Sequence, residues 1–185
     1  IMIKHVVWDW NGTLVDDVNL CVDILNHVLV AYMKPRISVE LYRRKFFFPV
    51  AKFYESIDLP SFGIEYEKLA NDYIKEYRNR FSECMLHPRA PETLEVLNEL
   101  SISQTILTAG EQKDVEAFAC FFNVKQWIQS IDGASNIEAK GKGDRAAAHI
   151  SKLKLDPKDG LLIGDTLPDQ EIANQVGCKA LLYSR

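Results

Sequence analysis

The sequence predicts an α/β protein, with a doubly wound, Rossmann-like parallel sheet core and an inserted all-helical domain. Two observations predict this class. Short β-forming runs that are apolar on both faces alternate with helical segments, as in parallel sheets covered by helices on both sides. After the first run, a long stretch shows helical periodicity only. With 185 residues, the chain has room for one domain and a modest insertion.

Three runs predict strands that are buried on both faces. They cover residues 3–8, 105–107 and 161–163, and each is followed by small and polar residues. Residues 180–183 are a candidate fourth strand. Because strand–helix–strand connections are right-handed, this alternation favours a doubly wound parallel sheet.

Helical segments separate these strands. One opens at Pro91, a residue type favoured in the first turn of a helix. Apolar residues at helical spacing predict a second helix over residues 115–122 and a third over about 144–153.

Residues 16–85 break the alternation. Apolar positions predict one helix over residues 20–29 and a long one over 66–81, and the aromatic-rich stretch between them is interrupted by Pro49. No convincing strand occurs here, and aromatic residues at helical spacing usually belong to a hydrophobic core. We therefore assign residues 1–15 and 86–185 to the core domain and residues 16–85 to the helical insert.

The composition excludes several classes of protein. Apolar residues make up 47% and charged residues 26%, as in an ordinary globular chain. Lys plus Arg is 22 and Asp plus Glu is 26, so the net charge of −4 leaves no basic surplus for nucleic acid. No apolar run approaches the ~18 residues of a membrane span, and no charged leader precedes an apolar stretch. The four cysteines form no C-x-x-C pair, so we expect reduced thiols in a cytoplasmic protein.

Asp9, Thr108 and Asp165 each come directly after one of the apolar runs. Since ligands of open α/β sheets bind beyond the carboxyl ends of the strands, we expect the three side chains at one edge. Gly12 would allow a tight turn after the first strand. Two carboxylates at one site repel each other unless a cation or proton lies between them. Mg²⁺ suits this pair because it takes oxygen ligands and retains several waters.

The same edge offers groups that bind an anion. Thr108 has a hydroxyl, and Ala109 and Gly110 have unhindered N–H groups at a strand-to-helix turn. A lysine would add positive charge, and both Lys140 and Lys142 are candidates. Together, these features indicate a site for phosphate and magnesium.

Each feature taken singly has an ordinary structural explanation. An Asp after a strand is commonly a turn or cap residue, and Gly164-Asp165-Thr166-x-x-Asp169 could cap the following helix. Their occurrence together, in order, on successive strands favours the functional interpretation.

A family resemblance rests on these same motifs. Asp9-Trp10-Asn11-Gly12-Thr13-Leu14 resembles the first motif of the haloacid dehalogenase-like (HAD) superfamily. Thr108, a lysine near 142, and residues 164–169 resemble its later motifs in order and spacing. The helical insert, including the aromatic residues of 46–54, resembles the small cap of the phosphoglycolate phosphatase-like branch.

The resemblance implies a nucleophile and a metal site. Asp9 would attack phosphorus and become an aspartyl phosphate. Asp165, Asp9 and the backbone carbonyl of Asn11 would bind Mg²⁺, with Asp169 supporting the metal directly or through another ligand. Phosphoryl transfer depends on in-line positioning and charge neutralisation, which these groups would supply.

The resemblance also implies a phosphate site. Thr108 and the following N–H, that of Ala109, would bind the phosphoryl oxygens. Lys142 is the preferred phosphate lysine because it directly precedes a predicted helix, and Lys140 remains open. The expected activity is Mg²⁺-dependent hydrolysis of a small phosphorylated metabolite, phosphoglycolate or a similar monoester.

Asn11 departs from the family pattern. Phosphatases of this superfamily usually have at this position an Asp that protonates the leaving group, and an amide cannot titrate. The protein could be a slow phosphatase or one for substrates with good leaving groups. It could borrow an acid such as Asp16 or Asp17, or bind phosphate compounds without turning them over. Asn11 could also hold its loop by hydrogen bonding.

A phosphonatase is a further alternative. Phosphonoacetaldehyde hydrolases of the superfamily resemble Asp-x-Ala-Gly-Thr in this motif and use a cap lysine as a Schiff base. No cap lysine lies in a recognisable context for that role; these lysines include Lys34, Lys45, Lys52 and Lys68. A dehalogenase is less favoured, since that branch does not need the magnesium arrangement.

Overall fold

The computed structural model describes residues 2–154 and 156–183, and the chain divides into two compact units. The core unit comprises residues 1–16, 86–135 and 142–185, and the helical unit comprises residues 17–85 and 136–141. The sequence predicts that residue 16 belongs to the insert, whereas the structure places it in the core unit. The sequence also predicts residues 136–141 in the core. The structure groups them with the helical unit, where the Val50 N–H donates to the Ala139 carbonyl over 3.3 Å.

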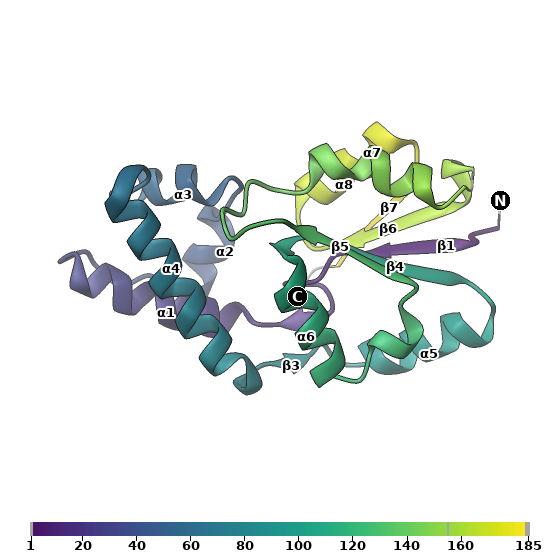
Figure 1. Ribbon diagram of the computed structural model, residues 1–185, viewed down its shortest axis with the longest axis horizontal. Helices are drawn as coiled ribbons and strands as arrows, with labels where there is room; N and C mark the ends of the chain where they lie inside the picture. Colours follow the sequence, from purple (N-terminus) through teal and green to yellow (C-terminus); the bar gives the residue numbers. More distant parts are fainter. Residues whose placement is uncertain (1, 155, 184–185) are drawn as a thin grey trace. The chain divides into compact units, whose positions relative to one another are not determined.

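The core unit is built on a five-stranded parallel sheet (Figure 1). The strand order is β5-β4-β1-β6-β7, so the first strand of the chain lies at the centre. The strands are β1 (His5–Trp8), β4 (Ser103–Glu111), β5 (Ser130–Ala134), β6 (Gly160–Gly164) and β7 (Lys179–Leu182). The doubly wound α/β class is thus confirmed, and β7 confirms the candidate fourth strand.

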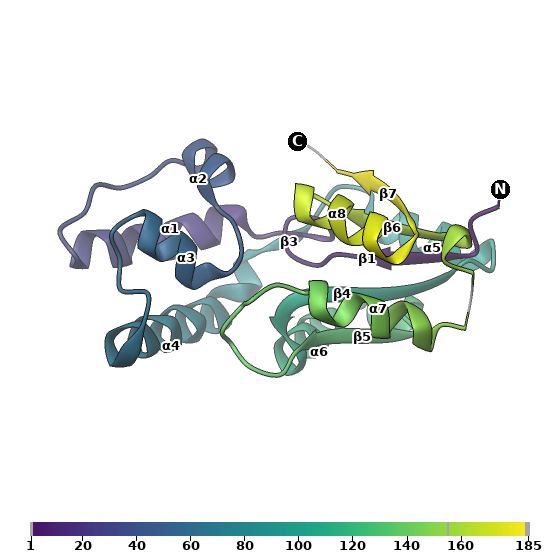
Figure 2. The same cartoon turned by 90° about the horizontal axis from the view of Figure 1, so that it is seen from above.

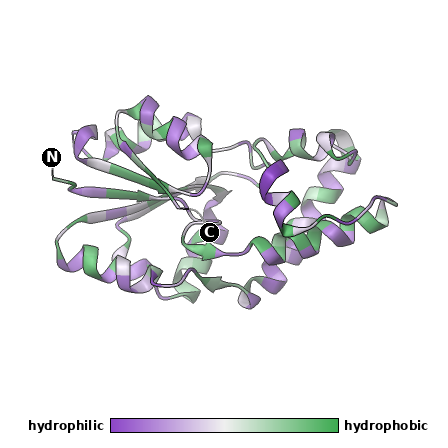
Figure 3. Cartoon of the chain, turned by 180° about the vertical axis from the view of Figure 1, so that it is seen from behind, coloured by the Kyte–Doolittle hydropathy of each residue, from purple (hydrophilic) through white to green (hydrophobic). Residues whose placement is uncertain are grey.

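Helices cover both faces of this sheet (Figure 1). One face carries α5 (Ala90–Glu99) and α6 (Gln112–Phe121), and the other carries α7 (Gly143–Lys152) and α8 (Leu167–Val176). Apolar and polar residues alternate along these helices, as Figure 3 shows, because only one side of each faces the sheet. Short 3-10 turns occur at η2 (Lys125–Trp127) and η3 (Pro157–Asp159).

Two features of the sheet differ from the prediction. β5 was not predicted, because its sequence Ser-Ile-Asp-Gly-Ala has only one large apolar residue and lies at the edge of the sheet. β4 extends beyond the predicted residues 105–107 to Glu111, and its pairing with β5 becomes irregular after Leu107.

The helical unit contains four helices among its described residues (Figure 2). These are α1 (Val18–Ala31), α2 (Val39–Lys45), α3 (Val50–Ser56) and α4 (Gly63–Arg80), with the short turn η1 (Phe81–Glu83) after the last. Helices α1 and α4 contact each other. Buried apolar and aromatic side chains join these helices, among them Leu25, Leu29, Phe53, Tyr54 and Leu69. The aromatic residues thus build a core, as predicted.

Two short strands, β2 (Val15–Asp16) and β3 (Met85–Leu86), pair in a separate sheet at the two ends of the inserted segment. Each has two residues, which is too short for a periodic signal in the sequence. None of the described helices is long and apolar enough to cross a bilayer.

Candidate active site

Three adjacent strands carry the predicted site residues at their carboxyl ends. Asp9 directly follows the central strand β1, and its N–H donates to the Ile163 carbonyl of β6 over 2.8 Å. Asp165 directly follows β6, and Thr108 lies in β4 on the other side of β1. The strand order therefore gathers residues that are far apart in sequence, as the parallel topology predicts.

Three carboxylates meet at this edge. Asp9, Asp165 and Asp169 each offer one oxygen atom, and these atoms lie within 4.8 Å of one another. The Thr13 hydroxyl lies 3.4 Å from Asp9 Oδ2 and 3.3 Å from Asp165 Oδ1. Thr13 is a site residue to which sequence reasoning gave no role, although it belongs to the first motif.

Two glycines allow the carboxylates to approach the backbone. Gly12 has a φ of +76°, and a Cβ atom there would lie 2.3 Å from Asp165 Oδ2. A Cβ atom on Gly164 would lie 2.2 Å from Asp169 Cγ. Larger residues at either position would displace a carboxylate, so the glycines are needed for this geometry as well as for the turn.

Lys142 is buried between two of the carboxylates. Its Nζ atom lies 2.6 Å from Asp9 Oδ1 and 2.6 Å from Asp169 Oδ1. Burial alone would lower the pKa of the Lys142 ammonium, but Asp9 and Asp169 outweigh this effect, and the pKa is raised. Lys140, the other candidate, is exposed and pairs with Glu138.

The charges at this edge do not balance. Burial raises the pKa of Asp9, Asp169 adds to the rise, and Lys142 opposes it. Burial and the carboxylates of Asp9 and Asp169 raise the pKa of Asp165 to about 7. Asp165 as a residue is exposed, but its carboxyl group packs against Gly12. Three carboxylates share one ammonium, so a divalent cation with oxygen ligands would fit this donor set.

Asp169 also begins a helix. Its Oδ2 atom accepts hydrogen bonds from the Thr166 N–H over 3.0 Å and from the Thr166 hydroxyl over 2.6 Å, in a capping box at the start of α8. The two interpretations of the Gly-Asp-Thr-x-x-Asp motif are therefore compatible: the motif caps α8 and brings two carboxylates to the site.

The phosphate-binding candidates lie in the irregular part of β4. Thr108 is buried, and its Oγ1 accepts a hydrogen bond from the Gly110 N–H over 3.1 Å. Ala109 lies between them and is also buried. The Asn11 Oδ1 atom would lie 3.7 Å from a Cβ atom on Gly110, so the Asn11 side chain adjoins the same stretch.

The two proposed substitute acids lie in different settings. Asp17 is buried in the helical unit and accepts a hydrogen bond from the Tyr77 hydroxyl over 2.7 Å. Asp16 ends the short strand β2 and is half-buried. The Tyr77 bond gives Asp17 a structural function within the helical unit.

Sequence reasoning also missed Arg145 and Asp132. The Arg145 guanidinium donates to the Asp132 carbonyl over 2.9 Å, to the Asp132 carboxylate and to the Thr108 carbonyl. The only signal in the sequence was the position of Arg145 one helical turn after Lys142.

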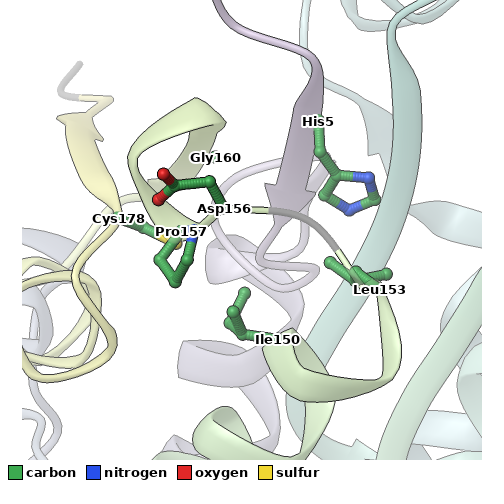
Figure 4. Close-up of a pocket in the computed structure, with 7 residues that line it drawn as sticks. All are labelled: His5, Ile150, Leu153, Asp156, Pro157, Gly160 and Cys178. Carbon is green, nitrogen blue, oxygen red and sulfur yellow. The ribbon is translucent and has the colours of Figure 1, made fainter.

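A separate small pocket lies at the opposite, amino-terminal edge of the sheet (Figure 4). It is lined mainly by apolar groups, with His5 at one side and Cys178 at another. None of the predicted site residues lines it.

This combination of a parallel sheet, a nucleophile candidate after the central strand and acidic residues after the next strand is typical of HAD-type hydrolases. Residues 6–183 match the family described as haloacid dehalogenase-like hydrolase, and the chain belongs to that family. No curated protein matches the chain.

Solved structures share the fold at low sequence identity. A haloacid dehalogenase-like hydrolase from Streptococcus pneumoniae is 21% identical, with a TM-score of 0.83 over 98% of this chain and 85% of that one. A predicted phosphoglycolate phosphatase from Haemophilus somnus is 19% identical, with a TM-score of 0.80 over 97% and 84%. A predicted phosphatase from Clostridium acetobutylicum is 17% identical, with a TM-score of 0.79 over 98% and 85%. At these identities, the similarity shows the fold alone.

Proposed function

We propose that this protein is a Mg²⁺-dependent phosphohydrolase that acts on a small phosphate monoester through an aspartyl-phosphate intermediate. One observation carries the proposal: the half-buried Asp9 carboxylate lies 2.6 Å from the Lys142 ammonium and within 4.8 Å of the Asp165 and Asp169 oxygens. A nucleophile that must meet a phosphoryl group needs such charge neutralisation. Family membership and the names of the structural relatives support this class of substrate.

Each residue has a role in the proposed first step. An Asp9 oxygen attacks phosphorus, the bond from phosphorus to the leaving oxygen breaks, and its electron pair departs with the leaving group. The Thr108 hydroxyl and the Ala109 N–H hold phosphoryl oxygens. Lys142 neutralises negative charge at the same place, and Asp169 orients Lys142 from the start of α8.

Asp9, Asp165 and the Asn11 backbone carbonyl would hold Mg²⁺. When bound, the ion supplies charge neutralisation between the carboxylates and the phosphoryl oxygens. Asp169, whose Oδ1 atom pairs with Lys142 and whose Oδ2 atom accepts from Thr166, would support the ion directly or by orienting Lys142. In the second step, water attacks phosphorus, the bond from phosphorus to the Asp9 oxygen breaks and frees the carboxylate, and the protons of the water leave with the phosphate product.

Asn11 defines the limit of this activity. It can donate and accept hydrogen bonds but cannot supply a proton to a departing alkoxide. We therefore propose that the preferred substrates have leaving groups that depart as anions, and that phosphoglycolate-like monoesters are hydrolysed slowly. Asn11 also supports a second candidate, a phosphate-binding HAD-fold protein without turnover.

The phosphonatase alternative has weaker support. Two of the cap lysines are already engaged in ion pairs within the helical unit: Lys34 lies 3.3 Å from Asp58 and Lys52 lies 3.0 Å from Glu55.

A panel of small phosphate esters, assayed with Mg²⁺ and with a chelator, tests the proposal. We expect turnover that needs Mg²⁺ and is lost in Asp9→Asn. Saturable binding of inorganic phosphate without turnover of any ester would instead support the binding protein. Turnover that persists in Asp9→Asn would contradict the covalent mechanism.

A further inference from the structure

We propose that Arg145 is a positioning residue for this site. It fastens the irregular end of β4, which carries Thr108, to the first turn of α7, which follows Lys142. The inference rests on the proposed function, since it assigns phosphate binding to Thr108 and Lys142. Its evidence lies entirely within the core unit.

Strand β4 pairs irregularly with β5 at the place where Arg145 contacts it. Leu107 pairs with Asp132 and Glu111 pairs with Ala134, so three residues of β4 stand opposite the single Gly133 of β5. Extra residues of this kind interrupt the ladder and re-aim side chains, often beside active sites. Here the interruption folds the Gly110 N–H back onto the Thr108 hydroxyl over 3.1 Å. Backbone groups taken out of the ladder need other partners.

The Arg145 guanidinium supplies those partners. Its Nη2 atom donates to the Thr108 carbonyl, and its Nη1 atom donates to the Asp132 carbonyl over 2.9 Å and to the Asp132 carboxylate. A planar guanidinium holds several acceptors in fixed geometry, which the single ammonium of lysine does not. One side chain thus joins β4, β5 and α7.

The backbone of Arg145 completes the connection to Lys142. The Arg145 N–H donates to the Lys142 carbonyl over 3.1 Å. Arg145 therefore contacts the backbone of Thr108 through its side chain and the backbone of Lys142 through its own N–H. The separation of the Thr108 hydroxyl and the Lys142 ammonium, which the proposed mechanism aims at one phosphoryl group, depends on this residue.

His149 provides a matched control one turn later on α7. Its Nδ1 atom lies 3.3 Å from Asp132 Oδ2, and its Nε2 atom lies 2.8 Å from the Thr105 hydroxyl. It joins the same helix to the same strands, and it shares Asp132 with Arg145. It contacts neither Thr108 nor Lys142 through any of these bonds, so its loss should affect stability without affecting phosphate binding.

The test compares Arg145→Met, Arg145→Lys and His149→Gln with the wild type in the presence of Mg²⁺. The inhibition constant of inorganic phosphate against p-nitrophenyl phosphate is measured well below each melting midpoint. We expect this inhibition constant to rise about tenfold in Arg145→Met and by a smaller factor in Arg145→Lys. A tenfold loss of affinity is typical when a residue that orients the binding side chains, without contacting the ligand, is removed. We expect His149→Gln to retain the wild-type inhibition constant, even if its melting midpoint falls as far as that of Arg145→Met.

Binding is also read without turnover, from the rise in melting midpoint that inorganic phosphate causes. A wild-type inhibition constant in both Arg145 variants, or in Arg145→Lys if only that variant folds, would overturn the inference. An equal rise of the inhibition constant in His149→Gln would show that Arg145 acts only on stability, and this result would also overturn the inference. If the wild type itself neither hydrolyses p-nitrophenyl phosphate nor is stabilised by phosphate, the proposed function fails instead.

Discussion

Asn11 is the residue that separates this chain from the phosphatase motif it resembles. Asn11→Asp is nearly isosteric and restores a titratable group at the position where a leaving group would take its proton. We expect the variant to raise turnover of alkyl phosphates more than turnover of aryl phosphates, which leave as stable anions. The gain should not exceed the ~10²–10⁴-fold ascribed to acid–base catalysis. Steady-state kinetics on one ester of each kind measures it.

Asp9→Asn is the control for this experiment, because it removes the nucleophile and should abolish turnover in either background. If Asn11→Asp leaves both kinds of ester equally slow while Asp9 is intact, acid loss does not limit the protein. An acid from elsewhere, or a binding function, would then be favoured.

Gly12 is a second residue with a specific requirement. A Cβ atom at this position would lie 2.3 Å from Asp165 Oδ2, so Gly12→Ala should displace that carboxylate. We expect kcat/KM to fall about 10²-fold, as for other displacements of about 1 Å at a reacting centre. Enzyme kinetics at saturating Mg²⁺ measures the loss.

Gly63→Ala is a matched control for backbone strain. Gly63 has a similar φ of +69°, but nothing lies within 4 Å of its Cβ position. Both variants should lose about 1–2 kcal/mol of stability, because a side chain disfavours the left-handed backbone conformation. Unchanged activity in Gly12→Ala, with the Gly63→Ala stability loss reproduced, would show that Asp165 does not need its observed position.

Strands β1 and β4 and helix α7 are joined by a buried network of histidines and hydroxyls. His5 Nδ1 lies 2.6 Å from the Ser103 hydroxyl, His5 Nε2 lies 2.9 Å from the Thr105 hydroxyl, and Thr105 also contacts His149. Burial, with a smaller effect of His149, lowers the pKa of His5 from 6.5 to about 4. The network therefore favours neutral histidine.

This network predicts a pH dependence of stability. The folded-state pKa of His5 lies below its unfolded value, so the unfolded chain takes up the proton first as the solution is acidified. The stabilising contribution is complete above pH 6.5 and is lost as the pH falls toward 4, by up to about 3 kcal/mol. Denaturant unfolding at several pH values should show a shallower dependence in His5→Asn than in the wild type.

His27→Asn removes an exposed histidine from α1 and controls for the loss of a histidine as such. If the free energy of unfolding falls equally in the wild type and in His5→Asn between pH 6.5 and pH 4.5, this stability cannot be assigned to His5.

At the scale of the whole molecule, metal binding should be linked to folding. Asp9, Asp165 and Asp169 meet only in the folded core unit, so an ion that binds them stabilises the native state. We expect millimolar Mg²⁺ to raise the melting midpoint by several degrees relative to a chelator. A free ligand at 100 times its dissociation constant adds about 2.7 kcal/mol to the free energy of unfolding. Thermal melts at matched ionic strength separate this effect from general screening.

Asp165→Asn distinguishes metal binding from misfolding. The variant removes one of three repelling carboxylates, so without metal its midpoint should equal or exceed that of the wild type. Its response to Mg²⁺ should be weaker. A midpoint of the wild-type protein that does not change with Mg²⁺ would count against the metal site.

The sequence alone predicts the α/β class, the central strands, the helical character of the insert and the carboxylates of the candidate site. The reason is that burial on both faces leaves a continuous apolar run, as in residues 3–8, and that periodicity reports a helix wherever one side is buried. Asp9 and Asp165 could be expected at one edge because parallel strands point their carboxyl ends the same way.

The folded structure was needed to place Lys142, which the sequence favours over Lys140, beside Asp9, to group residues 136–141 with the helical unit, and to show how β4 ends. Lys142 and Asp9 are separated by 133 positions, and no local pattern specifies a contact over that distance. The edge strand β5 has too few apolar residues to be recognised, although its Asp132 is held by Arg145. Such contacts arise from topology and charge pairing in the folded core, which periodicity along the chain does not encode.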